Sequence, residues 1–131
     1  MKKTPLINSR ISSVIAHMGH TDALTICDCG LPISDQAERI DLAVVRHLPG
    51  FFDVLEAVLQ ELCVERVVVA SELLVGNPAV FQKIAEAFPH IAIEEVPHEN
   101  FKQLTEDSKA IIRTGECTPY LNAILHAGTA F

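Results

Sequence analysis

The sequence predicts an α/β fold, a three-layer domain with a central mixed β-sheet flanked by helices. Short runs rich in branched apolar residues alternate along the chain with segments whose apolar residues recur at helical spacing. Glycine, proline or asparagine stands at most of the junctions. The first two and the last two strand-like runs have hairpin-like spacing, which favours a mixed sheet over a parallel one. With 131 residues, 49% of them apolar, the chain suits one domain spanning residues 1–131.

The N-terminal part predicts a helix, a strand and a turn. Asn8 or Ser9 can cap a helix that Gly19 is well placed to end. The apolar residues of this helix follow the spacing of one helix face: Ile11, Val14, Ile15 and Met18. Residues 23–28, ALTICD, have the composition of a short buried strand, and the glycine and proline of CGLPIS predict a turn after it. Asp28 is therefore expected at a strand end.

The middle of the chain alternates between strands and helices. RIDLAV, residues 39–44, predicts a second short strand. Pro49 and Gly50 precede a helix with one apolar face: Phe51, Val54, Leu55, Val58, Leu59 and Leu62. VERVVVA, residues 64–70, predicts a strand that is buried on both sides.

The second half predicts one more helix and three more strands. Asn77 caps that helix, Pro78 occupies its first turn, and Pro89 stops it. Its expected buried stripe is Val80, Phe81, Ile84, Ala85 and Phe88. The remaining segments are a strand at 91–96, a loop or short helix at 98–108, a strand at 109–115, and a last strand in 119–131 that reaches the C-terminus.

Composition narrows the range of partners. A net charge of −7 and a sequence pI near 5.2 argue against nucleic acid and anionic membranes, which bind clustered lysine and arginine. No apolar run reaches the roughly 18 residues that span a bilayer, and MKKTPLINSR lacks the apolar stretch of a secretory signal. The protein is therefore expected in the cytoplasm.

Neither the cysteines nor the glycines form a known cofactor motif. The four cysteines, Cys27, Cys29, Cys63 and Cys117, are expected to be reduced and to lie in or near the core. Their irregular spacing has no paired CxxC, and no Gly-rich phosphate loop is present. The sequence therefore predicts no cofactor.

Four polar clusters lie beside the predicted strand ends, where α/β sheets usually bind their ligands. They are GHTD at 19–22 together with Asp28, PHENFK at 97–102, IRTGE at 112–116, and TPYLN at 118–122. Each has an ordinary structural explanation when taken alone. A loop histidine is more often solvated than catalytic, and Asp28 is of a type that often caps a turn.

Together these segments resemble the D-ribose pyranase family over essentially the whole chain, and the fucose mutarotase family shares that architecture. The segments are NSRISSVIAHMGHTDALTICDCGLPIS, SELLVGNP, HENFKQLTEDSKAIIRTGE and TPYLNAILHAG. The resemblance implies a cofactor-free isomerase that interconverts β-D-ribopyranose and β-D-ribofuranose and supplies the furanose to ribokinase. By the same resemblance, His20 is the proton donor, and Asp28, His98, Tyr120 and Asn122 bind the sugar, with Lys102 a further candidate. Cys29 stands where small residues such as alanine are familiar.

These residue types suit the chemistry independently of the family. To leave the pyranose form, a sugar loses the proton of its anomeric hydroxyl and gains one on the ring oxygen, and closure by another hydroxyl reverses the steps. Histidine exchanges a proton near neutral pH, which suits His20. Carboxylate, phenol and amide groups hydrogen-bond sugar hydroxyls, as Asp28, Tyr120 and Asn122 offer. The residues leave open whether His98 or a bound water is the base.

Three other functions are open at this stage. One is a mutarotase for another monosaccharide such as fucose. Another is a metal site, for which His17, His20, Asp22 and Asp28 are the candidate ligands. The last is a non-catalytic sugar-binding or transport-associated module.

The resemblance also implies an assembly, a homodecamer of two stacked pentameric rings with sites where subunits meet. The apolar C-terminal tail is a candidate for burial at an interface: Ala123, Ile124, Leu125, Ala127 and Phe131. An ordinary interior strand is the alternative for this tail. If the tail is at an interface, Tyr120 and Asn122 are expected to reach a sugar held by His20 and Asp28 of a neighbouring subunit.

Overall fold

The computed structural model describes residues 1–131 and contains a six-stranded sheet in the order β2-β5-β1-β6-β3-β4. The strands are β1 (Ala23–Cys27), β2 (Arg39–Asp41), β3 (Val64–Ala70), β4 (Ile93–Val96), β5 (Ser108–Arg113) and β6 (Ala123–Ala127). The helices are α1 (Ser9–His17), α2 (Phe51–Leu59), α3 (Ser71–Gly76), α4 (Pro78–Ala87) and α5 (His98–Leu104), with a 3-10 turn at Thr105–Asp107. None of these helices has both the length and the apolar character that crossing a membrane requires.

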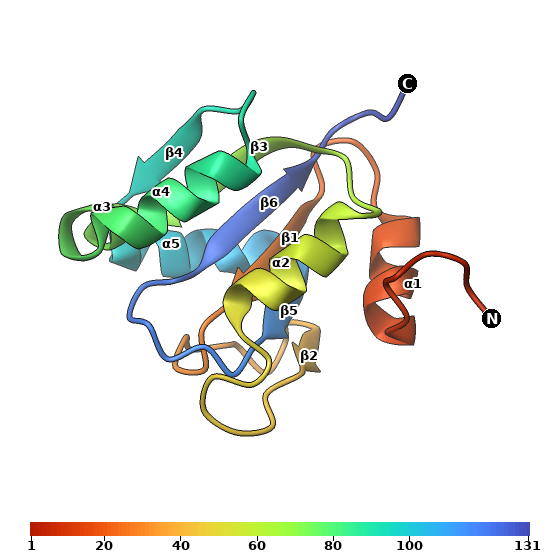
Figure 1. The fold of residues 1–131 in the computed structure, drawn as a ribbon, viewed down its shortest axis with the longest axis horizontal. Helices are drawn as coiled ribbons and strands as arrows, with labels where there is room; N and C mark the ends of the chain where they lie inside the picture. Colours follow the sequence, from red (N-terminus) through yellow and green to blue (C-terminus); the bar gives the residue numbers. More distant parts are fainter.

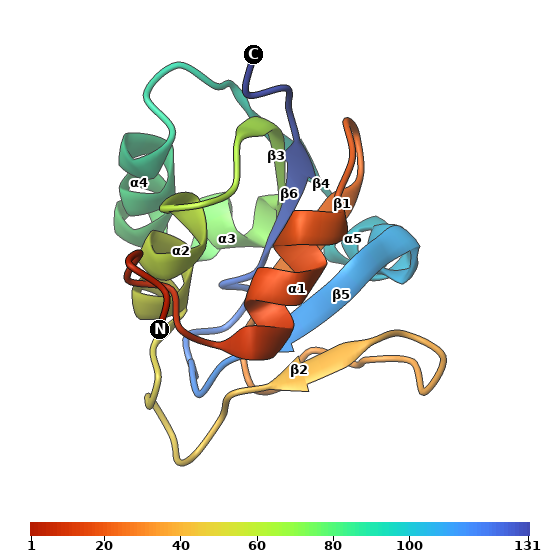
Figure 2. The ribbon, with the colours of Figure 1, turned by 90° about the vertical axis from the view of Figure 1, so that its right-hand side faces the viewer.

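The sheet lies between two unequal helical layers, as Figures 1 and 2 show. Helices α1 to α4 cover one face and bury a cluster of 22 residues against it, and α5 covers the other face over a cluster of eight. Because successive residues of a strand point to opposite faces, Leu24 and Ile26 join the larger core and Ala23 and Cys27 the smaller one. The predicted three-layer α/β fold is confirmed.

The sheet is mixed, as predicted, but the two expected hairpins do not form. Strand β6 lies antiparallel between β1 and β3, and the other neighbouring pairs are parallel. Strands β1 and β2 are not neighbours, and neither are β5 and β6. The physical reason is burial: all five residues of β1 are buried, so both of its edges need strand partners, whereas only the middle residue of β2 is buried, which suits a sheet edge.

Local signals placed the helix ends well. The side chain of Asn8 accepts a hydrogen bond from the Ile11 N–H, and Asn77 does the same for Val80 at the start of α4. Helix α3 was missed, because its six residues are too few to show a helical period. The polar segment after Pro97 is helical as α5.

Two burial expectations and one strand boundary were wrong. Strand β3 is buried only from Val67 onward, since Glu65 and Arg66 make ion pairs at the exposed end of the sheet. Strand β6 ends at Ala127 and does not reach the C-terminus; its residues form an interior strand, which was the alternative to an interface, and Phe131 is exposed. Among the cysteines only Cys27 is in the core; Cys63 is exposed and the other two are half-buried.

Strand direction decides where polar loops meet. The five mutually parallel strands end at the same edge of the sheet, the lower edge in Figure 1, and β6 begins there. The loops that follow β1, β4 and β5 therefore converge with the loop that precedes β6. The loop between α1 and β1 lies at the opposite edge.

Candidate functional site

A hollow of about 200 Å³ opens where these loops converge. It is lined by Asp28, Gly30, Leu31, His98, Pro119 and Tyr120. The residues come from the segments after β1 and β4 and from the loop before β6. Three of the predicted site residues thus line one hollow. Larger hollows exist elsewhere on the surface, but they gather fewer of these residues.

Asn122 holds the loop that carries Asp28. Its buried side chain accepts a hydrogen bond from the Asp28 N–H at 2.7 Å and donates one to Asp28 Oδ2 at 3.2 Å. The second oxygen, Oδ1, accepts the Gly30 N–H at 2.9 Å. The carboxylate of Asp28 is therefore oriented at the rim of the hollow. The Asn122 that orients it belongs to the same chain.

His98 is fixed by its backbone and by its ring. Its N–H donates to both carboxylate oxygens of Glu72, at 2.9 and 3.1 Å, and this hydrogen bond lowers the pKa of Glu72. The imidazole ring stacks on Phe101 at 6.2 Å and meets Tyr120 edge-on at 5.0 Å. Its Nδ1 atom is buried and has no hydrogen-bond partner in the chain. One nitrogen of His98 is thus left without a hydrogen-bond partner in a residue that lines the hollow.

Tyr120 follows an unusual backbone path. Its φ of 63° lies in the left-handed region, which non-glycine residues rarely adopt. Its side chain remains 38% exposed beside His98. Strained backbone of this kind persists where the surroundings hold it, often at functional sites.

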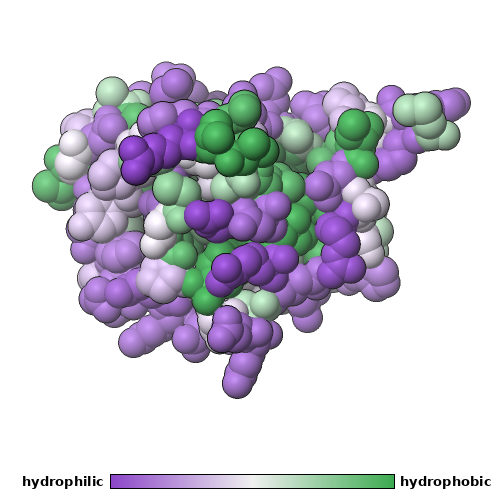
Figure 3. Space-filling model, turned by 90° about the horizontal axis from the view of Figure 1, so that it is seen from below, coloured by the Kyte–Doolittle hydropathy of each residue, from purple (hydrophilic) through white to green (hydrophobic).

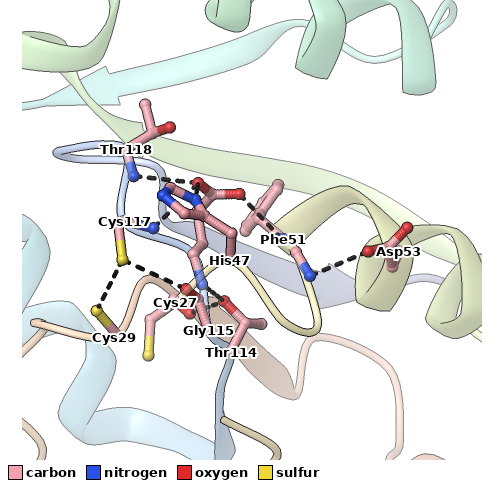
Figure 4. A network of polar contacts seen from close by, with 11 residues as sticks. Cys27, Cys29, His47, Phe51, Asp53, Thr114, Gly115, Cys117 and Thr118 are labelled. Atoms are coloured by element: carbon pink, nitrogen blue, oxygen red, sulfur yellow. Dashed lines mark hydrogen bonds and ion pairs between the residues drawn. The ribbon is translucent and has the colours of Figure 1, made fainter. Parts of the chain in front are cut away.

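Glu116 connects the surrounding loops, and Figure 4 labels its partners Phe51, Cys117 and Thr118. One carboxylate oxygen accepts the Cys117 and Thr118 N–H groups, each at 3.0 Å, and the other accepts the Phe51 N–H at the start of α2 at 3.2 Å. Its backbone carbonyl accepts the Cys29 N–H at 2.8 Å. Burial disfavours ionisation, but the hydrogen bonds from Thr118, Phe51 and Cys117 outweigh it and lower the pKa of Glu116. This single side chain joins α2 to the loop that leads to Tyr120.

Gly115 explains why the loop after β2 can pack so closely here. A Cβ atom added at Gly115 would lie 2.5 Å from the backbone oxygen of Leu48, so no larger residue fits without displacing the loop. The same loop brings His47 Nδ1 to 3.7 Å from the Glu116 carboxylate. Both Glu72 and Glu116 stand in blocks that carried the family resemblance, SELLVGNP and IRTGE, but neither was predicted as a site residue.

We predict that Glu116→Gln lowers the free energy of unfolding by about 2 kcal/mol at neutral pH, since charge-assisted hydrogen bonds are lost. The pKa of Glu116 is lowered in the native state, so the ionised form stabilises the fold above the unfolded value of about 4.3. That contribution to stability is lost as the pH falls through the lowered pKa of Glu116 in the native state. Urea unfolding of both proteins across this range measures the difference.

The exposed Glu86 of α4 provides the control, because Glu86→Gln should leave stability unchanged at every pH. A cost of Glu116→Gln that stays constant as the pH falls would contradict the prediction, since it would show that the charge contributes nothing.

His20 lies apart from this cluster. It precedes β1 and Asp28 follows it, and five strand residues at about 3.3 Å each separate them by roughly 16 Å. The expected pairing of His20 and Asp28 on one subunit, opposite Tyr120 and Asn122 of another, is therefore wrong. Asp28, Tyr120 and Asn122 belong together, because β1 and β6 lie side by side and meet at this edge.

At its own edge of the sheet, His20 has a partner that the sequence did not suggest. Its Nε2 lies 2.8 Å from a carboxylate oxygen of Glu65 on β3, and its side chain is 54% exposed. The one sequence feature that could have pointed to Glu65 as a partner is its charge, since it lies inside a run predicted to be buried. A carboxylate beside an imidazole hydrogen-bonds one ring nitrogen and so orients the ring.

Two other sets of predicted residues are not brought together. Lys102 pairs with Glu99 at 2.7 Å and lines a separate hollow of about 390 Å³, to which α5 and the segment 32–37 contribute. Among the alternative metal ligands, Asp22 accepts the Gly19 N–H and faces Lys109, whereas Asp28 is at the other end of β1. No group of three potential ligands forms.

The chain is similar to known proteins over its whole length. A model of the RbsD / FucU transport protein family matches residues 1–130. A D-ribose pyranase of Coprothermobacter proteolyticus is 50% identical over 131 residues, covering 100% of both chains. A D-ribose pyranase of Clostridium perfringens is 51% identical over 131 residues with the same coverage.

The chain is also similar to solved structures over its whole length. RbsD of Bacillus subtilis, complexed with D-ribose, matches with a TM-score of 0.96 at 43% identity, covering 100% of both chains. A fucose mutarotase of Streptococcus pneumoniae, in complex with L-fucose, matches with a TM-score of 0.82 at 20% identity, again covering 100% of both chains. At that lower identity, the second match shows the shared fold alone.

Proposed function

Because the chain belongs to the RbsD / FucU transport protein family, we propose that it is an isomerase that interconverts the pyranose and furanose forms of D-ribose. The observation that carries this proposal is the full-length match to a solved structure that holds D-ribose, together with curated relatives named D-ribose pyranase. In this proposal residues 1–131 form one domain that works in the cytoplasm and feeds furanose to a ribokinase.

The hollow beside Asp28 is the proposed sugar site. The Asp28 carboxylate accepts hydrogen bonds from sugar hydroxyls, and Asn122 keeps it oriented. The Tyr120 hydroxyl and the imidazole ring of His98, both in residues that line the hollow, are the further proposed hydrogen-bonding groups. Lys102 is not placed in this site by its contacts, since it lines a neighbouring hollow and pairs with Glu99.

His20 is the proposed acid and must come from another copy of the chain. Ring opening needs a proton delivered to the ring oxygen, within hydrogen-bond reach of the bound sugar. The His20 of the same chain is roughly 16 Å away along β1, too far for that reach. A ring of copies related by rotational symmetry would repeat one shared site at every interface. The proposed homodecamer of two stacked pentamers meets this requirement.

The surface around the hollow supports burial against another copy. Seen from below in Figure 3, this end of the molecule has an apolar area in its middle with hydrophilic side chains around it. The loop between β2 and α2, at the same end in Figure 1, exposes Val44, Val45 and Leu48 by 55% to 74%. Adjacent exposed apolar side chains of this kind are typical of interaction surfaces.

Saturation-transfer NMR on D-ribose tests the function directly, because it detects exchange between ring forms at equilibrium without product accumulation. We expect the protein to increase pyranose–furanose exchange for ribose by at least about tenfold over buffer, and fucose exchange far less. The signal should survive a chelator, since none of the proposed steps uses a metal. Faster exchange of fucose than of ribose would assign the site to another sugar, and ribose binding without exchange would favour the transport-associated module.

A further inference from the structure

Two thiols from distant parts of the chain face each other beside the proposed sugar site. Cys29 Sγ lies 3.6 Å from Cys117 Sγ, and 88 residues separate the two in sequence. Figure 4 shows both side chains pointing toward one another. Neither thiol has a role in the chemistry proposed above. Both residues are half-buried, so each is partly exposed in the single chain.

The backbone around the pair is already arranged for a crosslink. The Cys29 N–H donates to the carbonyl of Glu116, the residue before Cys117, so the two segments run side by side at this point. The Cys29 carbonyl is held in turn by Arg113 Nε at 3.1 Å. A disulfide needs a sulfur–sulfur distance of about 2.05 Å, so the two sulfurs must approach by about 1.5 Å. The crosslink therefore requires rotation of the two side chains and a small adjustment of the loops.

We propose that Cys29 and Cys117 form a modification site, a thiol pair that peroxides or low-molecular-weight disulfides convert reversibly into an intrachain disulfide. With hydrogen peroxide, one thiolate attacks an oxygen, the O–O bond breaks, and a sulfenic acid forms with release of hydroxide. The second thiol then attacks that sulfur, the S–S bond forms, and water leaves. The two thiols together lose two electrons and two protons, and a dithiol reductant restores them.

The other cysteines cannot take the place of this pair. Burial raises the pKa of Cys27 to about 12, so its thiolate is scarce and its sulfur is enclosed in the core. Cys63 is exposed at the opposite edge of the sheet, where its thiol contacts Thr129. The thiol–thiol contact raises the pKa of Cys29, so oxidation should accelerate as the pH increases.

The crosslink would join the two loops that shape the proposed sugar site. Cys29 follows Asp28 directly, and Cys117 lies three residues before Tyr120. Drawing the sulfurs together narrows the hollow between these loops, so the oxidised protein should exchange ribose more slowly. This consequence rests on the proposed function, whereas the crosslink itself does not.

The first test maps the crosslink without any sugar. The full-length protein is treated with hydrogen peroxide or oxidised glutathione, its remaining thiols are alkylated, and peptides are identified by mass spectrometry. We expect a peptide pair joining Cys29 to Cys117, and a melting temperature raised by on the order of 5 °C because a long loop is closed. Cys63→Ser should keep the crosslink, and Cys117→Ala should lose it. Oxidation confined to Cys63, with both facing thiols still alkylated, would overturn the proposal.

The second test measures ribose exchange in the reduced and oxidised protein. We expect oxidation to slow exchange at least about twofold, dithiothreitol to restore it, and Cys29→Ala to be insensitive to oxidant. A complete crosslink with unchanged exchange would refute the effect on the sugar site. Absence of exchange in the reduced protein would refute the proposed function, while the crosslink map would still decide whether the modification site exists.

Discussion

Replacing His20 with alanine is expected to abolish the accelerated exchange of ribose ring forms, a loss of at least about 100-fold, since general acid catalysis contributes that much or more. The fold should be intact, because the side chain is 54% exposed and its contact is an ion pair with Glu65. Saturation-transfer NMR measures the rate, and circular dichroism with light scattering verifies folding and assembly.

His17 supplies a matched control for this experiment. It is also an exposed histidine, three residues earlier, and it is the last residue of α1. Its ring hydrogen-bonds only the Ser13 carbonyl. His17→Ala should retain the wild-type exchange rate. A folded His20→Ala protein with the wild-type rate would remove His20 from the mechanism, and equal losses in both variants would point to a general effect on this edge of the sheet.

Co-assembly of two inactive variants is expected to restore activity from near zero to about a quarter of the wild-type level. His20→Ala removes the proposed acid, and Asp28→Ala removes a proposed sugar contact at the opposite edge of the sheet. When the two chains are unfolded together and refolded as an equal mixture, about one interface in four would combine an intact His20 with an intact Asp28. Exchange measured before and after mixing gives the restored fraction.

A second mixture serves as the control. Asp28→Ala and Tyr120→Ala both damage the same hollow, so every site in their mixture carries a defect and activity should stay near zero. A wild-type protein that is monomeric by light scattering would refute the shared site. If the protein forms a ring but the mixture of His20→Ala and Asp28→Ala stays inactive, His20 does not act at the site of a neighbouring subunit.

Local features of the sequence were enough to predict most helices and strands. The caps at Asn8 and Asn77 act within one helical turn, and apolar spacing directly reflects which face of a helix is buried. The polar motifs also identified residues of the hollow, because residue types such as those of DCGLP and TPYLN are specific in combination. A six-residue helix such as α3 lies below the length at which such spacing can be seen.

The sequence by itself determined the α/β class, most of the elements and the family. Each of these depends on local composition or on short motifs, which can be compared with those of known families directly. Only the tertiary structure decided which residues meet. The contacts of Asp28 with Asn122, Glu116 with Phe51, and His20 with Glu65 join positions 94, 65 and 45 residues apart. Such contacts depend on the order and direction of the strands. Insertion of β6 between β1 and β3 places Asn122 beside Asp28 at one edge of the sheet, and the direction of β1 leaves His20 at the other.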